Sequence, residues 1–231
     1  MIQYKRSVFL VLLVSLLLLL VVQPLVVGMP RSTVFFSLLS SILQVAAIFV
    51  LAEDRRLRVF AWLFGLPALF AIWGRHYVPP EHLEPAIVIA HALTSVFLAA
   101  TAILILRYVM THDITADSVV AAVCAYLLIG IVVGHLCFIV ETLDPGAYRV
   151  ADNLTANMED PDSRTALLTY YSFTTLTTTG YGDIVPNRPL SRTMAWMEAA
   201  TGQLYLTILI AGVVSMRVSQ KLTRSPASRS H

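Results

Sequence analysis

The chain has 231 residues, of which 57% are hydrophobic and 13% are charged, with a net charge of +2 and a mean hydropathy of +0.75. Soluble domains carry about 25% charged residues, so the composition excludes an ordinary soluble domain and indicates an integral membrane protein. No block of basic residues suggests binding to nucleic acid. No nucleophile–base pair, metal-ligand cluster or phosphate-binding loop indicates an enzyme or an organic cofactor.

Six apolar stretches predict membrane-spanning helices, because a bilayer core about 30 Å thick requires about 20 apolar helical residues. The five long stretches are Val8–Val27, Val34–Ala52, Ala86–Leu106, Val119–Val140 and Thr193–Met216. The sixth, Val59–Trp73, is shorter and contains Pro67, so it spans only if flanking polar residues reach both interfaces. The first stretch could instead be a signal peptide. Its length, and the lack of a small-x-small cleavage site, favour a retained helix.

Basic residues predict the orientation of these spans, since cytoplasmic loops carry an excess of lysine and arginine. With six spans and both termini in the cytoplasm, ten basic residues lie inside and six lie outside. The cluster between Arg55 and Arg58 and the basic C-terminal tail give most of this bias. We therefore expect a multi-pass protein of the cell (plasma or inner) membrane, in contact with the lipid bilayer, with cytoplasmic termini.

A shorter segment, Thr165–Leu176, lies between the last two spans and is apolar enough to enter the membrane. As a helix it covers about 18 Å, or roughly half of the bilayer. Asp162 and Ser163, which follow Pro161, supply helix-start signals. The Gly-rich polar backbone that follows is tolerated at membrane depth only where protein or water satisfies it. The segment is therefore predicted to be a re-entrant helix that faces a pore.

The polar run after this helix fits the chemistry of cation dehydration. An ion sheds water only if other oxygen atoms replace its hydration shell, and backbone carbonyls that all point to one axis can do so. Such a run requires glycine, because it demands φ angles that residues with a Cβ avoid. Gly180 and Gly182 have the required spacing, and Thr178 adds a hydroxyl at the inner mouth. The negative end of the short helix is expected to favour a cation in the central cavity.

At these residues the sequence resembles the potassium-channel family, whose pattern is Thr-x-Gly-Tyr-Gly followed by Asp. The matching residues are Thr178, Thr179, Gly180, Tyr181, Gly182 and Asp183. The resemblance covers about residues 119–217, and Thr179 replaces the usual valine. It implies that oxygens of the first four of these residues bind K⁺, with Gly182 completing the filter and the Tyr181 ring turned toward the pore-helix layer. One filter segment cannot encircle an ion, so a homotetramer is expected.

Three pore-helix residues are expected to support the filter. Tyr170 and Tyr171 stand where many bacterial channels carry two tryptophans. We predict that the Tyr171 hydroxyl donates a hydrogen bond to Asp183 of its own or a neighbouring subunit. Thr174 stands where some channels place a glutamate that pairs with the filter aspartate, so slow inactivation does not carry over from the resemblance.

The last span is expected to line the cavity and to form the gate. By the resemblance, Gly202, twenty residues after Gly182, takes the place of the gating hinge; the alternative is close helix packing, because glycine is common in membrane helices. Further lining residues at helical spacing are Gln203, Leu206, Ile210 and Val214, and the last two could close the inner mouth by dewetting. Glu198 is the only acid buried in a span. It is either functional or held by snorkelling or by a hydrogen bond to the filter layer.

The outer segment Glu141–Arg164 holds six acidic residues and two arginines, or a charge of about −4 per subunit. In a tetramer this segment is expected to concentrate cations at the mouth, with an effect that weakens as salt rises. Asp160 and Asp162 are the two acids whose neutralisation is expected to lower conductance at low ionic strength.

The fourth span lacks the charges of a voltage sensor, which needs several basic residues at three-residue spacing inside the field. Ala86–Leu106 offers only His91, with Arg107 at its cytoplasmic edge. We therefore expect no gating by a charged fourth helix. His91 and His135 are expected to be packed histidines rather than proton sensors, and Cys124 and Cys137 are expected to be ordinary buried thiols.

The sequence thus predicts an all-α membrane protein with six transmembrane helices, a re-entrant pore helix and a selectivity-filter loop in a tetrameric pore. Residues 1–112 form a four-helix N-terminal membrane domain, 113–218 the pore domain, and 219–231 a short cytoplasmic tail. The expected function is passive conduction of potassium. The alternatives are a non-conducting or regulatory subunit that co-assembles with a channel, and a weakly selective cation channel. A potassium transporter with four linked filter repeats requires four pore loops, and the chain holds one.

Overall fold

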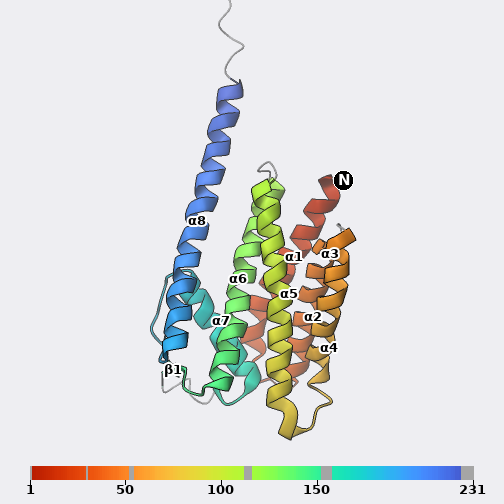
Figure 1. Ribbon diagram of the computed structural model, residues 1–231, viewed down its shortest axis with the longest axis vertical. Helices are drawn as coiled ribbons and strands as arrows, with labels where there is room; N and C mark the ends of the chain where they lie inside the picture. Colours follow the sequence, from red (N-terminus) through yellow and green to blue (C-terminus); the bar gives the residue numbers. More distant parts are fainter. Residues whose placement is uncertain (1, 30, 52–54, 112–115, 152–157, 225–231) are drawn as a thin grey trace, which may run out of the picture.

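The computed structural model describes residues 2–29, 31–51, 55–111, 116–151 and 158–224. The described chain is nearly all helical, and its long helices run roughly side by side (Figure 1). They are α1 (Ile2–Val26), α2 (Ser32–Leu51), α5 (Leu83–Thr111), α6 (Ala116–Leu143) and α8 (Pro189–Arg224). The start of α1 and the end of α8 lie at the same end of the bundle (Figure 1).

The third apolar stretch forms one continuous helical segment with a π-helical turn inside it. It consists of α3 (Arg55–Phe60), a π-helical segment η1 (Ala61–Gly65) and α4 (Leu66–Gly74), followed by the 3-10 turn η2 (Pro80–His82). Pro67 has no N–H, and its ring would collide with the carbonyl four residues earlier in a regular α-helix. The wider π turn ends two residues before this proline, so the helical path continues past it.

Five helical segments are long and apolar enough to cross a membrane. They are Ser7–Val26, Ser32–Leu51, Leu57–Gly74, Pro80–Thr111 and Asp117–Leu143. These segments coincide with the first five spans expected from the sequence, including the short one around Pro67. The last expected span lies within α8, which is not among these five.

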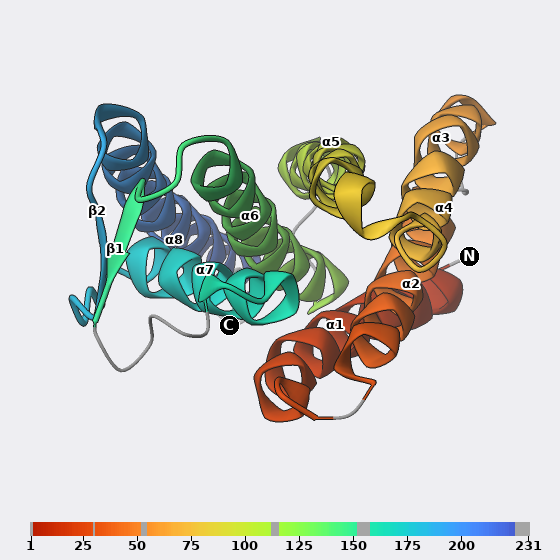
Figure 2. The same ribbon diagram turned by 90° about the horizontal axis from the view of Figure 1, so that it is seen from below.

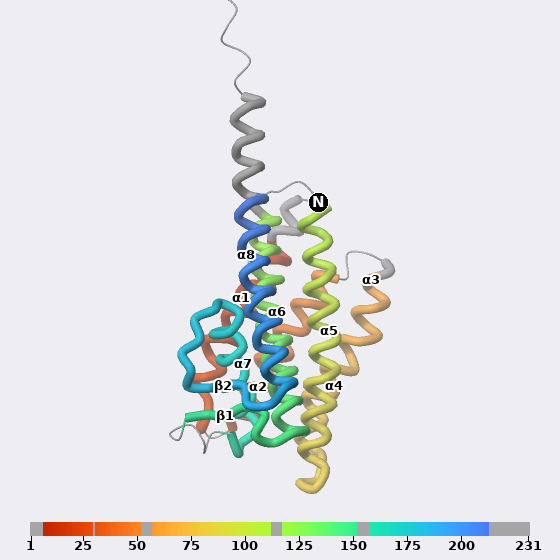
Figure 3. The backbone as a smooth tube through the Cα atoms, turned by 60° about the vertical axis from the view of Figure 1, so that its left-hand side comes forward, coloured from red at the N-terminus to blue at the C-terminus, as the bar shows by residue number. Residues whose placement is uncertain are grey.

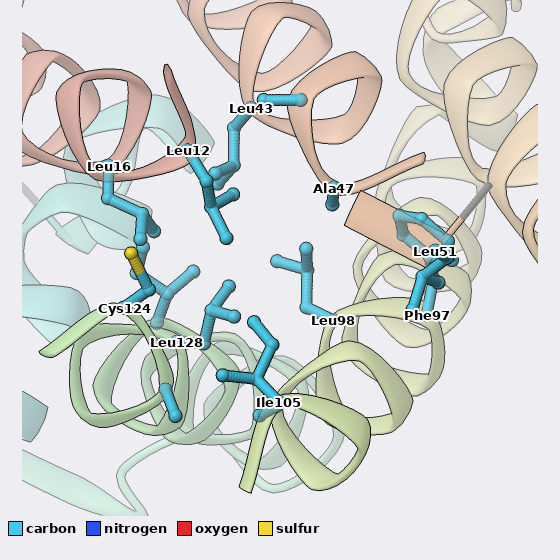
Figure 4. Close-up of a cluster of buried hydrophobic side chains, with 14 of the residues drawn as sticks. Leu12, Leu16, Leu43, Ala47, Leu51, Phe97, Leu98, Ile105, Cys124 and Leu128 are labelled. Atoms are coloured by element: carbon cyan, nitrogen blue, oxygen red, sulfur yellow. The ribbon is translucent and has the colours of Figure 1, made fainter. Parts of the chain in front are cut away.

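The main hydrophobic core lies where α1, α2, α5 and α6 meet. Leu12 and Leu16 of α1 point toward Leu43 of α2, Leu98 of α5 and Leu128 of α6 (Figure 4). All five side chains are at most 2% exposed. The first helix is therefore an integral part of the packed bundle.

The N-terminal helices pack against the pore segment of their own chain. Figure 2 shows α1–α4 on one side and α6, α7 (Pro161–Leu176) and α8 on the other, with α5 between them. Helix α5 packs along α6, and α1 contacts both α6 and α7. The link between α5 and α6 is residues 112–115, which contain the expected domain boundary and lie outside the described residues.

A two-stranded ladder fixes both ends of the pore segment. Strand β1 (Tyr148–Val150) follows α6, strand β2 (Ile184–Pro186) follows the filter residues, and the two pair antiparallel with Tyr148 opposite Pro186. Helix α7 and both strands lie in the same half of the bundle, beside the first turns of α8 (Figure 3). The segment between the strands therefore leaves and returns to one end of the bundle, as a re-entrant loop does.

An ion pair joins the N-terminal helices to the start of α7. Arg75, just after α4, places a guanidinium nitrogen 2.6 Å from the Asp162 carboxylate, and the two side chains are 15% and 6% exposed. Arg164, two residues further along α7, lies 3.5 Å from Glu84 at the start of α5. Removing one partner of a buried pair leaves an uncompensated charge, which is more damaging than removing both.

We expect Arg75→Ala to lower the free energy of unfolding by about 3 kcal/mol, measured as thermal and denaturant unfolding of the purified protein in detergent. The double variant Arg75→Ala/Asp162→Asn should recover part of this loss, because no buried charge is left. Arg107→Ala, which removes an exposed arginine of α5, is the control and should have little effect. Equal losses in the single and double variants would contradict this role of the ion pair.

Candidate functional site

Helix α7 begins with a side-chain cap. The Asp160 carboxylate accepts hydrogen bonds from the Ser163 backbone N–H (2.8 Å) and hydroxyl (2.7 Å), and Pro161 takes the first helical position. Proline is favoured there because its missing N–H would have no helical partner. The helix therefore starts four residues before the expected Thr165, and Asp160, rather than Asp162 or Ser163, is the capping residue.

The two acids expected to attract cations at the mouth have other roles. Asp162 is buried and paired with Arg75, so its charge is neutralised within the chain. Asp160 is exposed, but its carboxylate caps α7. The expected effect of these two acids on conductance at low ionic strength stays a prediction, and within one chain only Asp160 presents its charge to solvent.

The backbone of the predicted filter, residues 178–182, alternates in the sign of φ. Thr178 has a φ of +57°, Gly180 of +55° and Gly182 of +80°, whereas the intervening Thr179 and Tyr181 are not in the left-handed region. In an extended chain with φ of one sign, successive carbonyls point in opposite directions. Alternation of left-handed and right-handed residues turns them toward one side. Successive oxygens can therefore be presented along one path.

Thr178 adopts this conformation although it carries a Cβ. Left-handed backbone costs a non-glycine residue about 1–2 kcal/mol, so its surroundings must hold it. Its N–H donates to the Thr175 carbonyl (2.9 Å), its hydroxyl donates to the Thr177 carbonyl (2.7 Å), and the Gln203 amide donates to its hydroxyl oxygen (2.8 Å). The last contact ties the inner mouth of the filter to α8.

The neighbouring residues bind the filter to the end of α7. The Thr174 carbonyl accepts the N–H groups of both Thr179 (2.8 Å) and Gly180 (3.1 Å). The Thr174 hydroxyl bonds back to the Tyr171 carbonyl within its own helix. The Thr179 hydroxyl lies 2.9 Å from that of Thr177. Thr174 therefore contacts the filter through its backbone oxygen.

The tyrosine that bonds the filter aspartate is Tyr170, not Tyr171. The Tyr170 hydroxyl donates to the Asp183 carboxylate at 2.9 Å, and its ring stacks on the ring of Tyr181 with a 6.4 Å centroid separation. Tyr171 is buried and packs edge-on against Tyr148 of β1. Adjacent residues on a helix point about 100° apart, so only one of the pair can face the filter within a chain. The predicted Tyr171–Asp183 bond is corrected accordingly.

Gly202 lets α8 approach the end of α7. A Cβ built on Gly202 would lie 1.9 Å from the Leu176 carbonyl oxygen, a distance that no real contact allows. Helix α8 runs without interruption through this position. This contact supports the alternative reading of Gly202 as a close-packing residue, and its use as a hinge remains a prediction.

The other expected lining residues lie along one helix, partly uncovered within one chain. Leu206 is 39% and Ile210 is 61% exposed. Gln203 is also exposed and bonds Thr178. The side chain of Val214 lies outside the described residues. The expected gate at Ile210 and Val214 is therefore untested.

Several contacts around the site were not foreseen from the sequence. Ser172 of α7 touches both Glu198 of α8 and the Gly130 carbonyl of α6. The hydroxyl of Tyr205 donates to the Ala122 carbonyl at 2.5 Å. Only the buried acid Glu198 offered a signal in the sequence, and the contact with Ser172 supports its expected hydrogen bond near the filter rather than snorkelling.

The paired histidines pack together, as expected. The rings of His91 and His135 meet edge-on with centroids 4.6 Å apart, and His91 also packs on Phe138 at 4.3 Å. Burial of Cys124 and Cys137 as free thiols is also as expected.

Comparison with known proteins gives a family match for the part of the chain that contains α7 and the predicted filter. Residues 122–218 match the family model of ion channels. The match covers most of α6, all of α7, the predicted filter residues and most of α8, and leaves α1 to α5 outside. No curated protein and no solved structure matches the chain. The family match and the apolar helices together support an ion channel of multi-pass membrane type.

Gly202→Ala tests whether α8 must approach α7 this closely in the ion-channel segment. We expect a loss of about 1–3 kcal/mol in the free energy of unfolding, since the added methyl group meets a backbone oxygen that cannot turn aside. Thermal unfolding in detergent measures it. Gly74→Ala is the matched control, because a Cβ there meets nothing within 4 Å. A wild-type transition for Gly202→Ala would show that α8 stands further away.

Tyr170→Phe tests the corrected hydrogen bond. Loss of a bond to a charged acceptor costs about 1.5–3 kcal/mol, and we expect the lower end because Tyr170 is 38% exposed. The variant should denature at a lower temperature, whereas Tyr77→Phe, which alters an 87% exposed tyrosine, should not. If Tyr171→Phe destabilised the protein and Tyr170→Phe did not, the original assignment would be restored.

Proposed function

We propose that the chain is a potassium-selective channel subunit that conducts K⁺ passively through a homotetrameric pore in the cell membrane. The observation that carries the proposal is the alternating sign of φ at Thr178, Gly180 and Gly182. Such an alternation supports the proposal, because it would turn successive carbonyls to one side, where they can replace the water around a dehydrated cation. Thr178, Thr179, Gly180 and Tyr181 are the proposed K⁺-binding residues.

The uncovered surface of one chain supports assembly. Residues 177–182 are all exposed, and the Tyr181 ring is 71% exposed although it is aromatic. Helix α8 also carries exposed apolar residues, among them Trp196, Leu204 and Ile208. One chain offers carbonyls on a single side of an ion path. Four copies around one axis would complete the shell and cover the apolar surface.

The geometry of α7 supports a cation path below the filter. The helix ends at Leu176, immediately before the filter, so its negative dipole end lies at the inner mouth. In the proposed orientation the start of α1 and the end of α8 face the cytoplasm. Gating would not depend on lysine or arginine residues in the membrane field at α5, where none lies between Leu83 and Leu106.

Flux measurements on the purified protein in liposomes test the proposal. Under a K⁺ gradient we expect cation uptake that K⁺ supports and Na⁺ does not, and a reversal potential close to that of K⁺ in mixed salt. A reversal potential near zero in equal K⁺ and Na⁺ would show a weakly selective channel. No flux from a folded tetramer would favour a non-conducting subunit.

Gly180→Ala separates the filter conformation from general strain. We expect loss of K⁺-selective flux, because alanine resists the left-handed backbone by about 1–2 kcal/mol in each of four subunits. Gly28→Ala is the matched control: Gly28 also has a positive φ (+77°) and open space around it, but it lies in the turn after α1. It should keep its selectivity. Unchanged selectivity in Gly180→Ala would remove the main support for the proposal.

A further inference from the structure

A carboxyl group is buried where α6, α7 and α8 meet. Glu198 is 4% exposed, and one of its oxygens lies 2.5 Å from the hydroxyl oxygen of Ser172, which is fully buried. The same hydroxyl oxygen lies 2.7 Å from the Gly130 carbonyl. The three oxygens form a chain that links the inner helix, the pore helix and the outer helix.

Counting hydrogens along this chain fixes the protonation state of Glu198. A serine hydroxyl has one hydrogen, while a carbonyl and an ionised carboxylate can only accept. With Glu198 ionised, the single hydrogen of the Ser172 hydroxyl can be donated either to the Glu198 carboxylate or to the Gly130 carbonyl. The other of these two close oxygen–oxygen contacts then has no hydrogen between its atoms. With Glu198 protonated, two hydrogens serve two contacts: Glu198 donates to Ser172, and Ser172 donates to Gly130.

The surroundings offer nothing to stabilise a negative charge. The titratable side chains that face Glu198 are Tyr126 and Cys137 of α6, Tyr148 of β1 and Tyr171 of α7. Thiols and phenols are ordinarily uncharged at neutral pH, and burial raises the pKa of Tyr148 further. Among the described residues no cation contacts the carboxyl group, and its second oxygen has no hydrogen-bond partner. An isolated buried carboxylate is strongly disfavoured.

We propose that Glu198 is a neutral carboxylic acid that positions the pore helix, by donating a hydrogen bond to Ser172 and through it to Gly130. The effect on conduction rests on the proposed channel function; the protonation state does not. Ser172 lies one turn before Leu176, and Glu198 lies one turn before Gly202, which packs on Leu176. We call the hydrogen-bonded chain of Glu198, Ser172 and the Gly130 carbonyl the clamp. The clamp therefore sets the register between α7 and α8 beside the inner mouth of the filter.

The proposal gives the sign of a pH effect. The clamp is complete while Glu198 holds its proton and is lost as pH rises and the proton leaves. Alkaline pH, not acid, should therefore loosen α7 from α8. A glutamine at this position keeps an amide donor of the same length and has no proton to lose, so it should hold the clamp at every pH.

Infrared spectroscopy of the purified protein measures the protonation state of Glu198 and does not require the protein to conduct ions. At neutral pH the exposed acids are ionised, and we expect a carbonyl band of a protonated carboxylic acid that Glu198→Gln removes and that fades at alkaline pH. Carbon-13 labelling of glutamate side chains should shift this band in the unaltered protein, so the result holds even if the variant folds poorly. Absence of a labelled protonated-acid band at neutral pH would overturn the proposal.

Flux and thermal unfolding then test the positioning role. Between neutral and alkaline pH the wild-type flux should fall about tenfold, the effect of losing one buried hydrogen bond on the conductive state. Glu198→Gln should conduct normally and lose this pH dependence, whereas Ser172→Ala should be impaired at both pH values. Thermal unfolding should follow the same pattern. Parallel pH profiles in wild type and Glu198→Gln would refute the role. A protonated acid in a protein that conducts nothing would instead refute the channel.

Discussion

The sign of φ along the filter is the constraint on which the rest of the structure depends. Gly180 and Gly182 satisfy it without cost, but Thr178 adopts a left-handed conformation that its side chain opposes. It remains there because contacts from α7 and from Gln203 of α8 hold its backbone and hydroxyl. The arrangement of carbonyls is therefore a property of the packed helices around the filter as much as of the filter sequence.

Helix α7 transmits that constraint through fixed contacts along its length. At its start Asp162 is paired with Arg75, one turn before its end Ser172 meets α6 and α8, and at its end the Leu176 carbonyl lies against Gly202. Tyr170 adds a direct bond to the filter aspartate. A displacement of α7 at any of these points must move the carbonyls of its last turn, which accept the N–H groups of Thr178, Thr179 and Gly180.

The sequence predicted the local features well, because each depends on a short stretch of chain. Span lengths follow from hydropathy, and the re-entrant helix follows from an apolar run of half the bilayer before polar backbone. The π turn before Pro67 and the left-handed Thr178 were also local but were not foreseen. Thr178 lies two residues before Gly180 and four before Gly182, and this every-second-residue spacing was the available sequence signal for its left-handed conformation.

Contacts between distant residues could not be predicted in the same way. Arg75 and Asp162 are 87 residues apart, and no feature of the sequence around either residue indicates the other as its partner. The choice between Tyr170 and Tyr171 depends on the rotation of α7 about its axis, which is set by packing against α6 and β1. Glu198 was recognised as an unusual acid, but its partner Ser172 could be found only once α7 and α8 were placed side by side.

The placement of the N-terminal helices limits how they can act on the pore. Each elementary charge that moves through the membrane field supplies about 2.3 kcal/mol per 100 mV, and α5 carries no lysine or arginine between Leu83 and Leu106 on which the field could act. The N-terminal helices nevertheless contact α6, mainly through α5 and α1, and Arg75 forms an ion pair with Asp162 at the start of α7. The described contacts through which these helices can act on α7 are therefore their packing against α6 and α7 and the ion pairs that Arg75 and Glu84 make with Asp162 and Arg164.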